Sequence, residues 1–140
     1  MRSRLATPSA TRAVLEEFGL ATKHRLGQNF LVNDAIIEKI CDLAELGPDD
    51  VVLEVGPGIG TLTVAMLEAC SAVVSLEADH ELEQVLASTC ARDSEKFALL
   101  MGDALRVAPE DVADAVASLG EVLAAAMPNK FVSNLPYQVA

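Results

Sequence analysis

A glycine-rich turn near the middle of the chain constrains the fold more than any other segment. It follows residues 51–55, a short apolar run rich in β-branched side chains that predicts a buried strand. The glycines of the turn are Gly56, Gly58 and Gly60, and apolar residues then recur at helical spacing up to residue 69. Glycine permits a tight turn and a close approach of the backbone to a ligand. A strand, this turn and a helix in succession predict a loop that cradles a phosphate or a nucleoside, the alternative being a strand-to-helix turn without a ligand.

Apolar runs and helical patterns alternate along the rest of the chain. Runs at 72–77, 97–101 and 130–134 predict three further strands. Such alternation is typical of an α/β fold with a parallel sheet. Helices are predicted over 9–18, 33–44, 61–69, 79–90 and 108–118, with Asn33 and Asp79 as N-cap residues.

Two carboxylates follow predicted strands. Glu77 ends the second run, 21 residues after Gly56, where a carboxylate can accept hydrogen bonds from both hydroxyls of a ribose. A nicotinamide dinucleotide site would use the same device, so Glu77 indicates a nucleoside without choosing the cofactor. Asp103 follows the third run and is expected at the same edge of the sheet, where open α/β sheets bind ligands. The alternatives are a solvated acid at a helix start for Glu77 and a helix cap for Asp103.

The tetrapeptide Asn134-Leu135-Pro136-Tyr137 follows the fourth run and suits a planar amine on a base. The lone pair of the adenine N6 amine is delocalised into the ring, so two acceptors aimed at its hydrogens would hold it and favour a tetrahedral nitrogen. The Asn134 side-chain oxygen and the Leu135 carbonyl can be those acceptors, and Pro136 restricts the backbone around them. Tyr137 offers a face for stacking, and the base must leave its own stack to reach such a pocket. The alternative is an ordinary Asn-x-Pro turn.

These motifs together resemble a known family. The glycine spacing after Glu54 is similar to the S-adenosylmethionine (SAM) loop of Rossmann-like methyltransferases. With the lead-in Gly27-Gln28-Asn29-Phe30-Leu31, the chain resembles the bacterial small-subunit (16S) rRNA adenine N6,N6-dimethyltransferases. The resemblance implies SAM-dependent dimethylation of two adjacent adenosines near the 3′ end of 16S rRNA, with Asn134, Leu135, Pro136 and Tyr137 facing the adenine. It also implies a SAM site, formed by Gln28, Asn29, Leu31, Gly56, Gly58, Gly60, Glu77, Asp103 and Asn134.

Three other functions stay open at this point. Large-subunit rRNA adenine methylases carry similar motifs. A SAM-dependent methyltransferase for a small molecule or a protein amide would share the cofactor loop. Relatives of the family have also become RNA-binding assembly factors without catalytic activity. The Gly27-Gln28-Asn29-Phe30-Leu31 lead-in favours the small-subunit branch, and Asn134 and Tyr137 favour an enzyme.

Composition bears on the class of protein and on its partners. A chain of 140 residues with 51% apolar side chains can bury one compact core. The net charge of −11 is unusual for an RNA-binding protein. However, residues 1–25 carry a net charge of +3, which suggests that this N-terminal arm faces RNA. The expected partner is small-subunit rRNA in the immature small ribosomal subunit, and a cytoplasmic monomer without a metal or a membrane span is expected. The cysteines are expected as reduced, buried thiols, at Cys41, Cys70 and Cys90.

The expected organisation has two parts. Residues 1–32 form an N-terminal helix and basic arm with the Gly-Gln-Asn-Phe-Leu signature, and residues 33–140 form a partial Rossmann-like methyltransferase domain. The resemblance implies a seven-stranded sheet in the order 3-2-1-4-5-7-6, so the domain is expected to be truncated after its fourth strand. A pocket at the end of an unsupported edge strand is poorly held, and we therefore expect the chain alone to be inactive.

Overall fold

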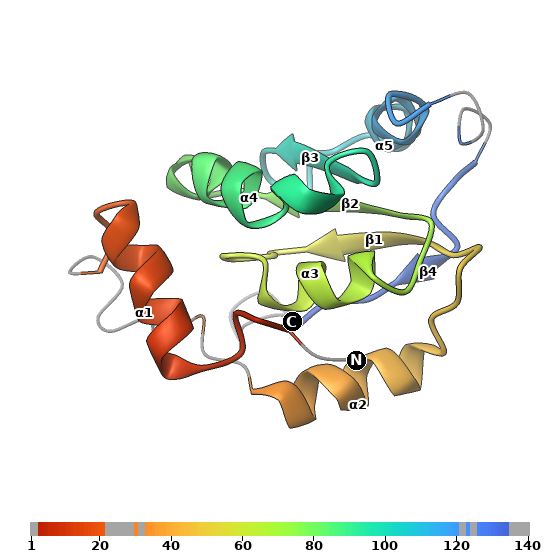
Figure 1. The fold of residues 1–140 in the computed structure, drawn as a ribbon. Coiled ribbons are helices and arrows are strands. Elements are labelled where there is room, and N and C mark those ends of the chain that lie inside the picture. Colours follow the sequence, from red (N-terminus) through yellow and green to blue (C-terminus); the bar gives the residue numbers. More distant parts are fainter. Residues whose placement is uncertain (1–2, 22–29, 31–32, 121–122, 124–125, 135–140) are drawn as a thin grey trace.

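A four-stranded parallel sheet with helices on both sides forms the centre of the molecule (Figure 1). The computed structural model describes residues 3–21, 30, 33–120, 123 and 126–134. The strands lie in the order β3-β2-β1-β4. The elements in chain order are α1 (Pro8–Glu17), α2 (Asp34–Ala44), β1 (Val51–Val55), α3 (Thr61–Leu67), β2 (Ala72–Glu77), η2 (His80–Leu82), α4 (Glu83–Thr89), η3 (Ala91–Asp93), β3 (Phe97–Met101), α5 (Pro109–Ala117) and β4 (Lys130–Phe131).

The predicted α/β fold and the strand order 3-2-1-4 are confirmed. Every neighbouring pair of strands is parallel, with Val51 opposite Ala72 and Val73 opposite Phe97. Parallel strands need crossover connections, which α3, α4 and α5 provide here. All carboxyl ends of the strands therefore meet at one edge, which is where the glycine-rich turn lies.

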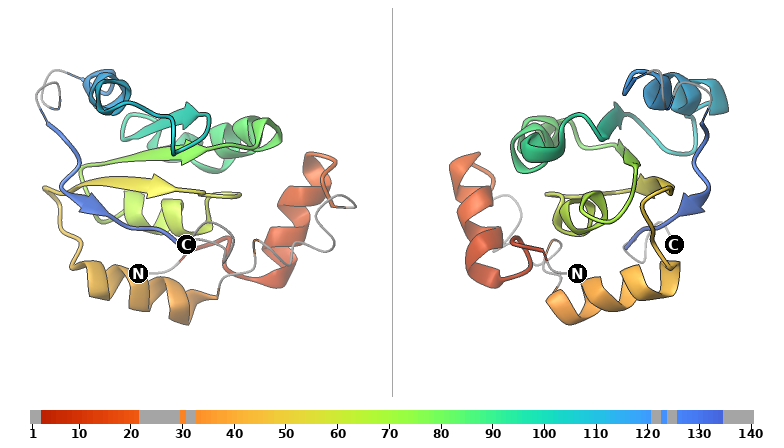
Figure 2. Two further views of the ribbon diagram at one scale, coloured as in Figure 1. Left: turned by 180° about the vertical axis from the view of Figure 1, so that it is seen from behind. Right: turned by 45° about the vertical axis from the view of Figure 1, so that its right-hand side comes forward.

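The two faces of the sheet carry separate apolar clusters. Alternate side chains of a strand point to opposite faces, so Val52 and Val73 join one cluster while Val51 and Val74 join the other. The first and larger cluster also takes in residues of α2, α3 and α4, and the second takes in Ala115 and Val116 of α5. Figures 1 and 2 accordingly show α5 on the opposite side of the sheet from α3. The N-terminal segment contributes to the larger cluster as well, through Leu5, Ala6, Leu15 and Leu20.

The helix boundaries follow local capping. Asn33 and Asp79 cap helix starts as predicted, because their side chains accept from the backbone N–H of Ile36 and Glu81. The helix predicted over 79–90 is divided into the 3₁₀ turn η2 and the shorter helix α4. The helix predicted over 9–18 begins at Pro8, because the Thr7 hydroxyl accepts from the Ala10 N–H and proline suits a first turn.

The fourth strand is shorter than predicted. Its regular pairing covers only Lys130–Phe131, and the ladder ends with the Val132 N–H donating to the Leu53 carbonyl at 3.1 Å. Beyond that bond the Ser133 side chain replaces the backbone: its hydroxyl donates to the Val55 carbonyl and accepts from the Val55 N–H. A side chain that takes both bonds of a ladder position ends the strand, yet it keeps the following residue beside β1.

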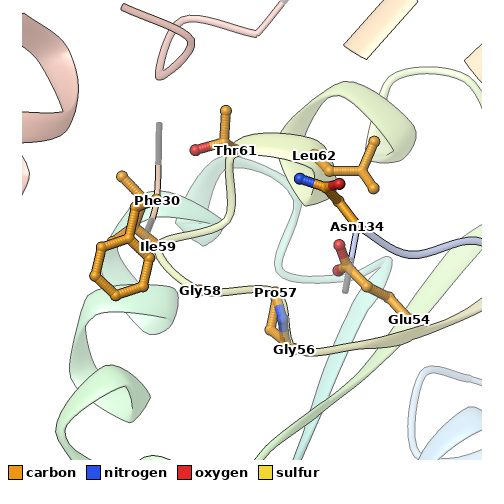
Figure 3. A pocket seen from close by; sticks show the side chains of 9 residues that line it. All are labelled: Phe30, Glu54, Gly56, Pro57, Gly58, Ile59, Thr61, Leu62 and Asn134. Carbon is orange, nitrogen blue, oxygen red and sulfur yellow. The ribbon is translucent and has the colours of Figure 1, made fainter. Parts of the chain in front are cut away.

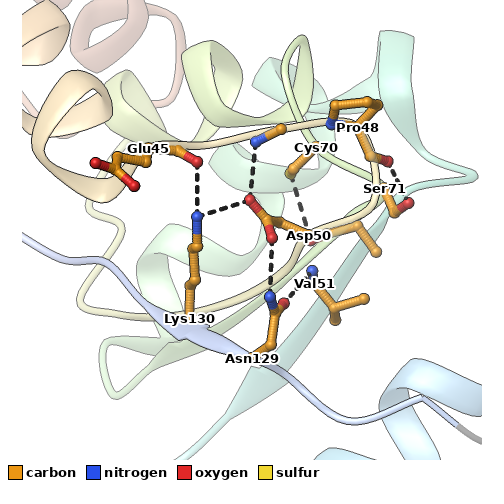
Figure 4. A network of polar contacts seen from close by, with 10 residues as sticks. Glu45, Pro48, Asp50, Val51, Cys70, Ser71, Asn129 and Lys130 are labelled. Atoms are coloured by element: carbon orange, nitrogen blue, oxygen red, sulfur yellow. Dashed lines mark hydrogen bonds and ion pairs between the residues drawn. The ribbon is translucent and has the colours of Figure 1, made fainter.

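A polar cluster at the opposite edge of the sheet fixes the register of β4. The Asp50 carboxylate accepts from Asn129 Nδ2 at 2.8 Å and from Lys130 Nζ at 2.9 Å (Figure 4). Asn129 Oδ1 in turn accepts from the Val51 N–H at 2.8 Å. We call Asp50, Asn129 and Lys130 the Asp50 clamp. It joins the residue before β1 to the start of β4, across 79 positions of sequence.

The three cysteines of the chain are buried and free, as predicted. Burial raises the pKa of Cys70 to about 11 and that of Cys90 to about 12, so these thiols are not ionised at neutral pH. Among the helices that the structure describes, none has the length and apolar character needed to cross a membrane.

The Asp50 clamp generates a prediction about stability and pH. Hydrogen bonds from Asn129, Lys130 and Gly47 lower the pKa of Asp50 to about 2, below its usual value of about 4. The clamp therefore stabilises the fold above about pH 4, and this contribution is lost as the pH falls toward 2. We predict that Asp50→Asn lowers the thermal unfolding midpoint at pH 7. The difference from the wild type should shrink between pH 4 and pH 2 in circular dichroism melts, whereas a constant difference would contradict the assigned role.

Candidate functional site

Two positions of the glycine-rich turn, Gly58 and Gly60, suit no residue type other than glycine. Gly58 has φ +61° and Gly60 has φ +95°, both in the region that favours glycine. A Cβ added at Gly58 would lie 2.8 Å from the Phe30 ring, and one at Gly60 would lie 2.9 Å from Thr89 Oγ1. The loop therefore packs closely against Phe30 at Gly58 and against Thr89 at Gly60.

A pocket opens beside this loop, at the carboxyl edge of the sheet (Figure 3). It holds about 40 Å³, which is room for little more than one water molecule or one small group of a ligand. A nucleoside cofactor would therefore have only one end here and would extend along the sheet edge. The pocket is lined by Phe30, Glu54, Gly56, Pro57, Gly58, Ile59, Thr61, Leu62 and Asn134.

Glu54 is the buried carboxylate of the pocket, with 1% of its surface exposed. Its Oε1 accepts from Thr63 Oγ1 at 2.5 Å and from Ser75 Oγ at 2.8 Å. Both of these hydrogen bonds go to the same oxygen, and Glu54 is among the residues that line the pocket. Burial raises the pKa of Glu54 to about 7, against the opposing effect of the two hydroxyls. The carboxyl therefore changes charge near neutral pH.

Thr61 is a pocket residue that the sequence motifs did not single out. Its side-chain oxygen is buried without a hydrogen-bond partner, alone in this respect among the residues that the structure describes. Buried hydroxyls normally have partners, so an unpaired one beside a pocket points to a ligand. The signal available in the sequence was its place as the first residue of the helix after Gly60.

Asn134 reaches the pocket from β4. The Ser133 side chain holds the chain beside Val55, and the Asn134 amide lies close to the Glu54 carboxylate in Figure 3. The structure thus brings together two predicted elements that are far apart in sequence, the glycine loop and the start of the tetrapeptide, with Gly56 and Asn134 separated by 78 positions. The remaining predicted residues of the two flanking motifs lie outside the described residues: Gln28, Asn29, Leu31, Leu135, Pro136 and Tyr137.

Glu77 ends β2 as predicted, and its carboxylate supports the glycine loop through hydrogen bonds to the backbone. Its Oε1 accepts from the Gly58 N–H at 3.2 Å and its Oε2 from the Asp79 N–H at 3.0 Å. The side chain is buried and does not line the pocket. Each carboxylate oxygen keeps a further lone pair for a ligand hydroxyl. Binding of a ribose by Glu77 stays a prediction, while its role in holding the loop is a finding.

Asp103 lies further along the same edge and is exposed. Its Oδ1 accepts from the Leu105 N–H at 2.9 Å, and its Oδ2 lies 3.8 Å from Arg106 Nε. The carboxylate therefore caps a turn between β3 and α5. A ligand that contacts both Glu77 and Asp103 would lie along the ends of β2 and β3.

One arginine of the basic N-terminal arm has a partner inside the fold, and the RNA contact predicted for the arm stays a prediction. The guanidinium of Arg4 donates a hydrogen bond to the Thr89 carbonyl within the protein. Arg12 is exposed on α1, and Arg2, Lys23 and Arg25 lie outside the described residues. At least one of the five basic residues of the arm thus has a structural partner inside the fold.

Solved structures share this fold. The 23S rRNA methyltransferase ErmE aligns with a TM-score of 0.59 and 29% sequence identity, over 79% of this chain and 39% of its own. A dimethyladenosine transferase from Plasmodium falciparum aligns with a TM-score of 0.59 and 23% identity, over 77% of this chain and 34% of its own, which supports the fold alone. Fold and loop together define a Rossmann-like methyltransferase domain.

Sequence relatives identify the family within that class. The family model described as ribosomal RNA adenine dimethylase matches residues 19–140. Proteins named ribosomal RNA small subunit methyltransferase A match at 39% identity in Geobacillus kaustophilus and at 44% in Opitutus terrae. These matches cover 99% and 96% of this chain and 45% and 46% of the relatives, so the chain spans about half their length. The chain belongs to the ribosomal RNA adenine dimethylase family.

Glu54 gives the site a testable pH dependence. Its pKa is raised to about 7, so the folded state binds a proton more tightly than the unfolded state, whose glutamate pKa is about 4. Stability should therefore fall as the pH rises from about 4 to 7, by an amount on the order of 2 kcal/mol from this group.

We predict that Glu54→Gln removes this fall in stability between about pH 4 and 7, as measured by urea unfolding at several pH values. The variant keeps an acceptor for Thr63 and Ser75. Glu83→Gln, at an exposed position of α4, is the control and should keep the slope of the wild type. An unchanged slope in Glu54→Gln would contradict the assignment.

Proposed function

We propose that this protein is a SAM-dependent methyltransferase that dimethylates N6 of two adjacent adenosines near the 3′ end of 16S rRNA. The observation that carries the proposal is the convergence of Glu54, the glycine loop and Asn134 at one pocket, in a member of the rRNA adenine dimethylase family. The family supports the reaction, and the convergence supports the place where it occurs.

The residues of the pocket fit the methionine end of SAM. The hydroxyl of Thr61 is buried and has no partner, and it can donate to a carboxylate. The Glu54 carboxylate can accept from an ammonium group. When bound, SAM supplies an electrophilic methyl group on its sulfonium.

The nucleoside end of SAM would extend along the sheet edge. Glu77 at the end of β2 would accept from the ribose hydroxyls with its remaining lone pairs. Asp103 at the end of β3 would accept from the exocyclic amine of the adenine. Gln28, Asn29 and Leu31 would cover the same site from the N-terminal side. These roles rest on the family resemblance and on the shared edge of the sheet.

The target adenine would be held by the tetrapeptide. The Asn134 side-chain oxygen and the Leu135 carbonyl would accept hydrogen bonds from the two hydrogens of the N6 amine. These bonds would favour a tetrahedral nitrogen, whose lone pair is no longer delocalised into the ring. Pro136 would fix the direction of the carbonyl, and Tyr137 would stack on the base. This is catalysis by positioning and by electrostatic stabilisation.

A second candidate is methylation of large-subunit rRNA. The structural similarity to the 23S rRNA methyltransferase ErmE favours it, because identity and TM-score are at least as high there as for the dimethyladenosine transferase. The curated relatives named for the small subunit, at up to 44% identity, favour the first candidate. Under either candidate the partner is ribosomal RNA. We further propose the immature small ribosomal subunit as the partner and a monomer that acts in the cytoplasm.

The cofactor assignment predicts a clear loss of affinity on changing Glu77. Hydrogen bonds to a charged group contribute roughly 1.5–3 kcal/mol, which corresponds to about 10- to 150-fold in affinity. We therefore predict at least a tenfold weaker binding of SAM by Glu77→Gln in calorimetry. Glu83→Gln serves as a control, because it removes an exposed carboxylate from the neighbouring helix. Equal losses in both variants would remove Glu77 from the site.

For a protein of the relatives' full length that carries this chain, the substrate assignment predicts transfer of labelled methyl groups from SAM to small ribosomal subunits that lack the modification, and not to free adenosine. Asn134→Ala should lower transfer by about a hundredfold or more, as misplacement of reacting groups commonly does. The same variant should keep most of its SAM affinity, because its main proposed partner is the adenine amine. Transfer to large-subunit RNA would support the second candidate, and transfer to protein alone would contradict both.

A further inference from the structure

Thr89, the last residue of α4, lies against the glycine loop from the side away from the pocket. Its hydroxyl donates to the Ile59 carbonyl at 2.9 Å, and Thr89 is only 7% exposed. The same oxygen is the atom that a Cβ at Gly60 would meet first, at 2.9 Å. Thr89 is not among the residues that line the pocket. Thr89 therefore bonds to the loop backbone at Ile59 and fills the space beside Gly60, outside the lining of the pocket.

The N-terminal segment holds Thr89 from the other direction. The Arg4 guanidinium donates to the Thr89 carbonyl, one of the carbonyls at the end of α4. Cationic groups are favourable at a helix C-terminus because unpaired carbonyls gather there. Thr89 thus uses its carbonyl toward Arg4 and its hydroxyl toward Ile59, so one residue joins the N-terminal segment to the loop.

The segment around Arg4 is itself fixed in the fold. Leu5 and Ala6 are buried in the larger apolar cluster. The Ser3 N–H donates to Asp34 Oδ1 at 2.9 Å, and the Thr11 hydroxyl donates to the Leu5 carbonyl at 3.1 Å. Arg4 is therefore presented by an anchored piece of chain, which lies far from the loop in sequence and next to α4 in space.

The loop has a separate support on its other side. There the Gly58 N–H donates to Glu77 Oε1, and the Gly56 N–H donates to the Leu76 carbonyl at 2.9 Å. The described hydrogen bonds to the loop from α4 come from Thr89 alone. Loss of the hydroxyl would leave the buried Ile59 carbonyl without this donor, and the second half of the loop would lose its support.

We propose that Thr89 is a positioning residue for the glycine loop, and that Arg4 acts on the loop through Thr89. The docked N-terminal segment thereby sets the loop geometry on which cofactor affinity depends. The part that concerns affinity rests on the proposed function, because it takes SAM as the ligand of the loop. The part that concerns loop geometry does not depend on any ligand.

The test compares Thr89→Ala with Thr89→Ser, because serine keeps the hydroxyl and loses only the methyl group. Two readouts are needed: amide hydrogen exchange of the peptide that contains the loop, without ligand, and calorimetric affinity for S-adenosylhomocysteine. We expect Thr89→Ala to speed exchange in the loop and to weaken binding by about three- to tenfold, the range that one neutral hydrogen bond supplies. The affinity of Thr89→Ser should stay within about twofold of the wild-type affinity, because the hydrogen bond is kept. Ser88→Ala, one position earlier and exposed, is the matched control and should change neither readout.

A double-mutant cycle tests the role of Arg4. Arg4→Met should weaken binding in the wild-type background and should add no further loss in the Thr89→Ala background, because its effect passes through the Thr89 hydroxyl. Arg12→Met, at an exposed position of α1, controls for the loss of one positive charge.

Three outcomes would overturn the proposal. These are equal losses in Thr89→Ser and Thr89→Ala, exchange that rises as much in β2 as in the loop, and losses from Arg4→Met and Thr89→Ala that simply multiply. If the wild type binds no S-adenosylhomocysteine, the proposed function fails. Hydrogen exchange, measured in the Arg4→Met variants as well as the Thr89 variants, still decides whether Thr89 and Arg4 position the loop.

Discussion

The pairing of β4 with β1 is the interaction on which the candidate site depends. It is a short pairing, formed by two ladder residues and extended by the Ser133 side chain on Val55. Because the strands are parallel, their carboxyl ends lie at the same edge, and the residue after Ser133 is delivered beside the glycine loop. The Asp50 clamp fixes the same register at the far end of the two strands. A shift of β4 by one residue would exchange the faces of its side chains and would remove Asn134 from Glu54.

Burial of the Glu54 carboxylate carries a cost in free energy, which its raised pKa reflects. An ionised carboxylate without partners is strongly disfavoured in a protein interior. Here Thr63 of α3 and Ser75 of β2 place hydroxyls on one of its oxygens, so two polar side chains stand where apolar ones would otherwise pack. Their presence in an otherwise apolar layer is explained by Glu54, and the presence of Glu54 is explained by the pocket. The unfavourable burial of Glu54 thus occurs at the position where the proposed function needs an acceptor for the ammonium group of SAM.

The sequence predicted the architecture well because its signals are local. Strands β1, β2 and β3 have the predicted bounds, since each is a short apolar run with a clear end. The N-caps Asn33 and Asp79 were predictable for the same reason. The early end of β4 was not, because it depends on a hydrogen bond between the Ser133 side chain and a strand 78 residues away.

The site was predictable in outline and not in detail. The approach of Asn134 to the glycine loop follows from motif order and from parallel topology. The structural partner of Arg4 lies 85 positions away, so no local pattern in the sequence could predict it. The hydroxyl of Thr61 resembles any other helix-start threonine in sequence, and only its burial without a partner distinguishes it. Each of these features depends on tertiary contacts, which the local pattern of apolar residues does not predict.

The helix that follows the glycine loop is unusual because all seven of its residues, Thr61–Leu67, are buried. A close-packed helix of this kind cannot slide or rotate without disturbing the core around it. The loop that leads into it is therefore preorganised, and a ligand loses little conformational entropy of the protein by binding there. Discrimination among ligands at this edge of the sheet must then come from differences in their contacts, because the loop has little freedom to adapt its shape to each of them.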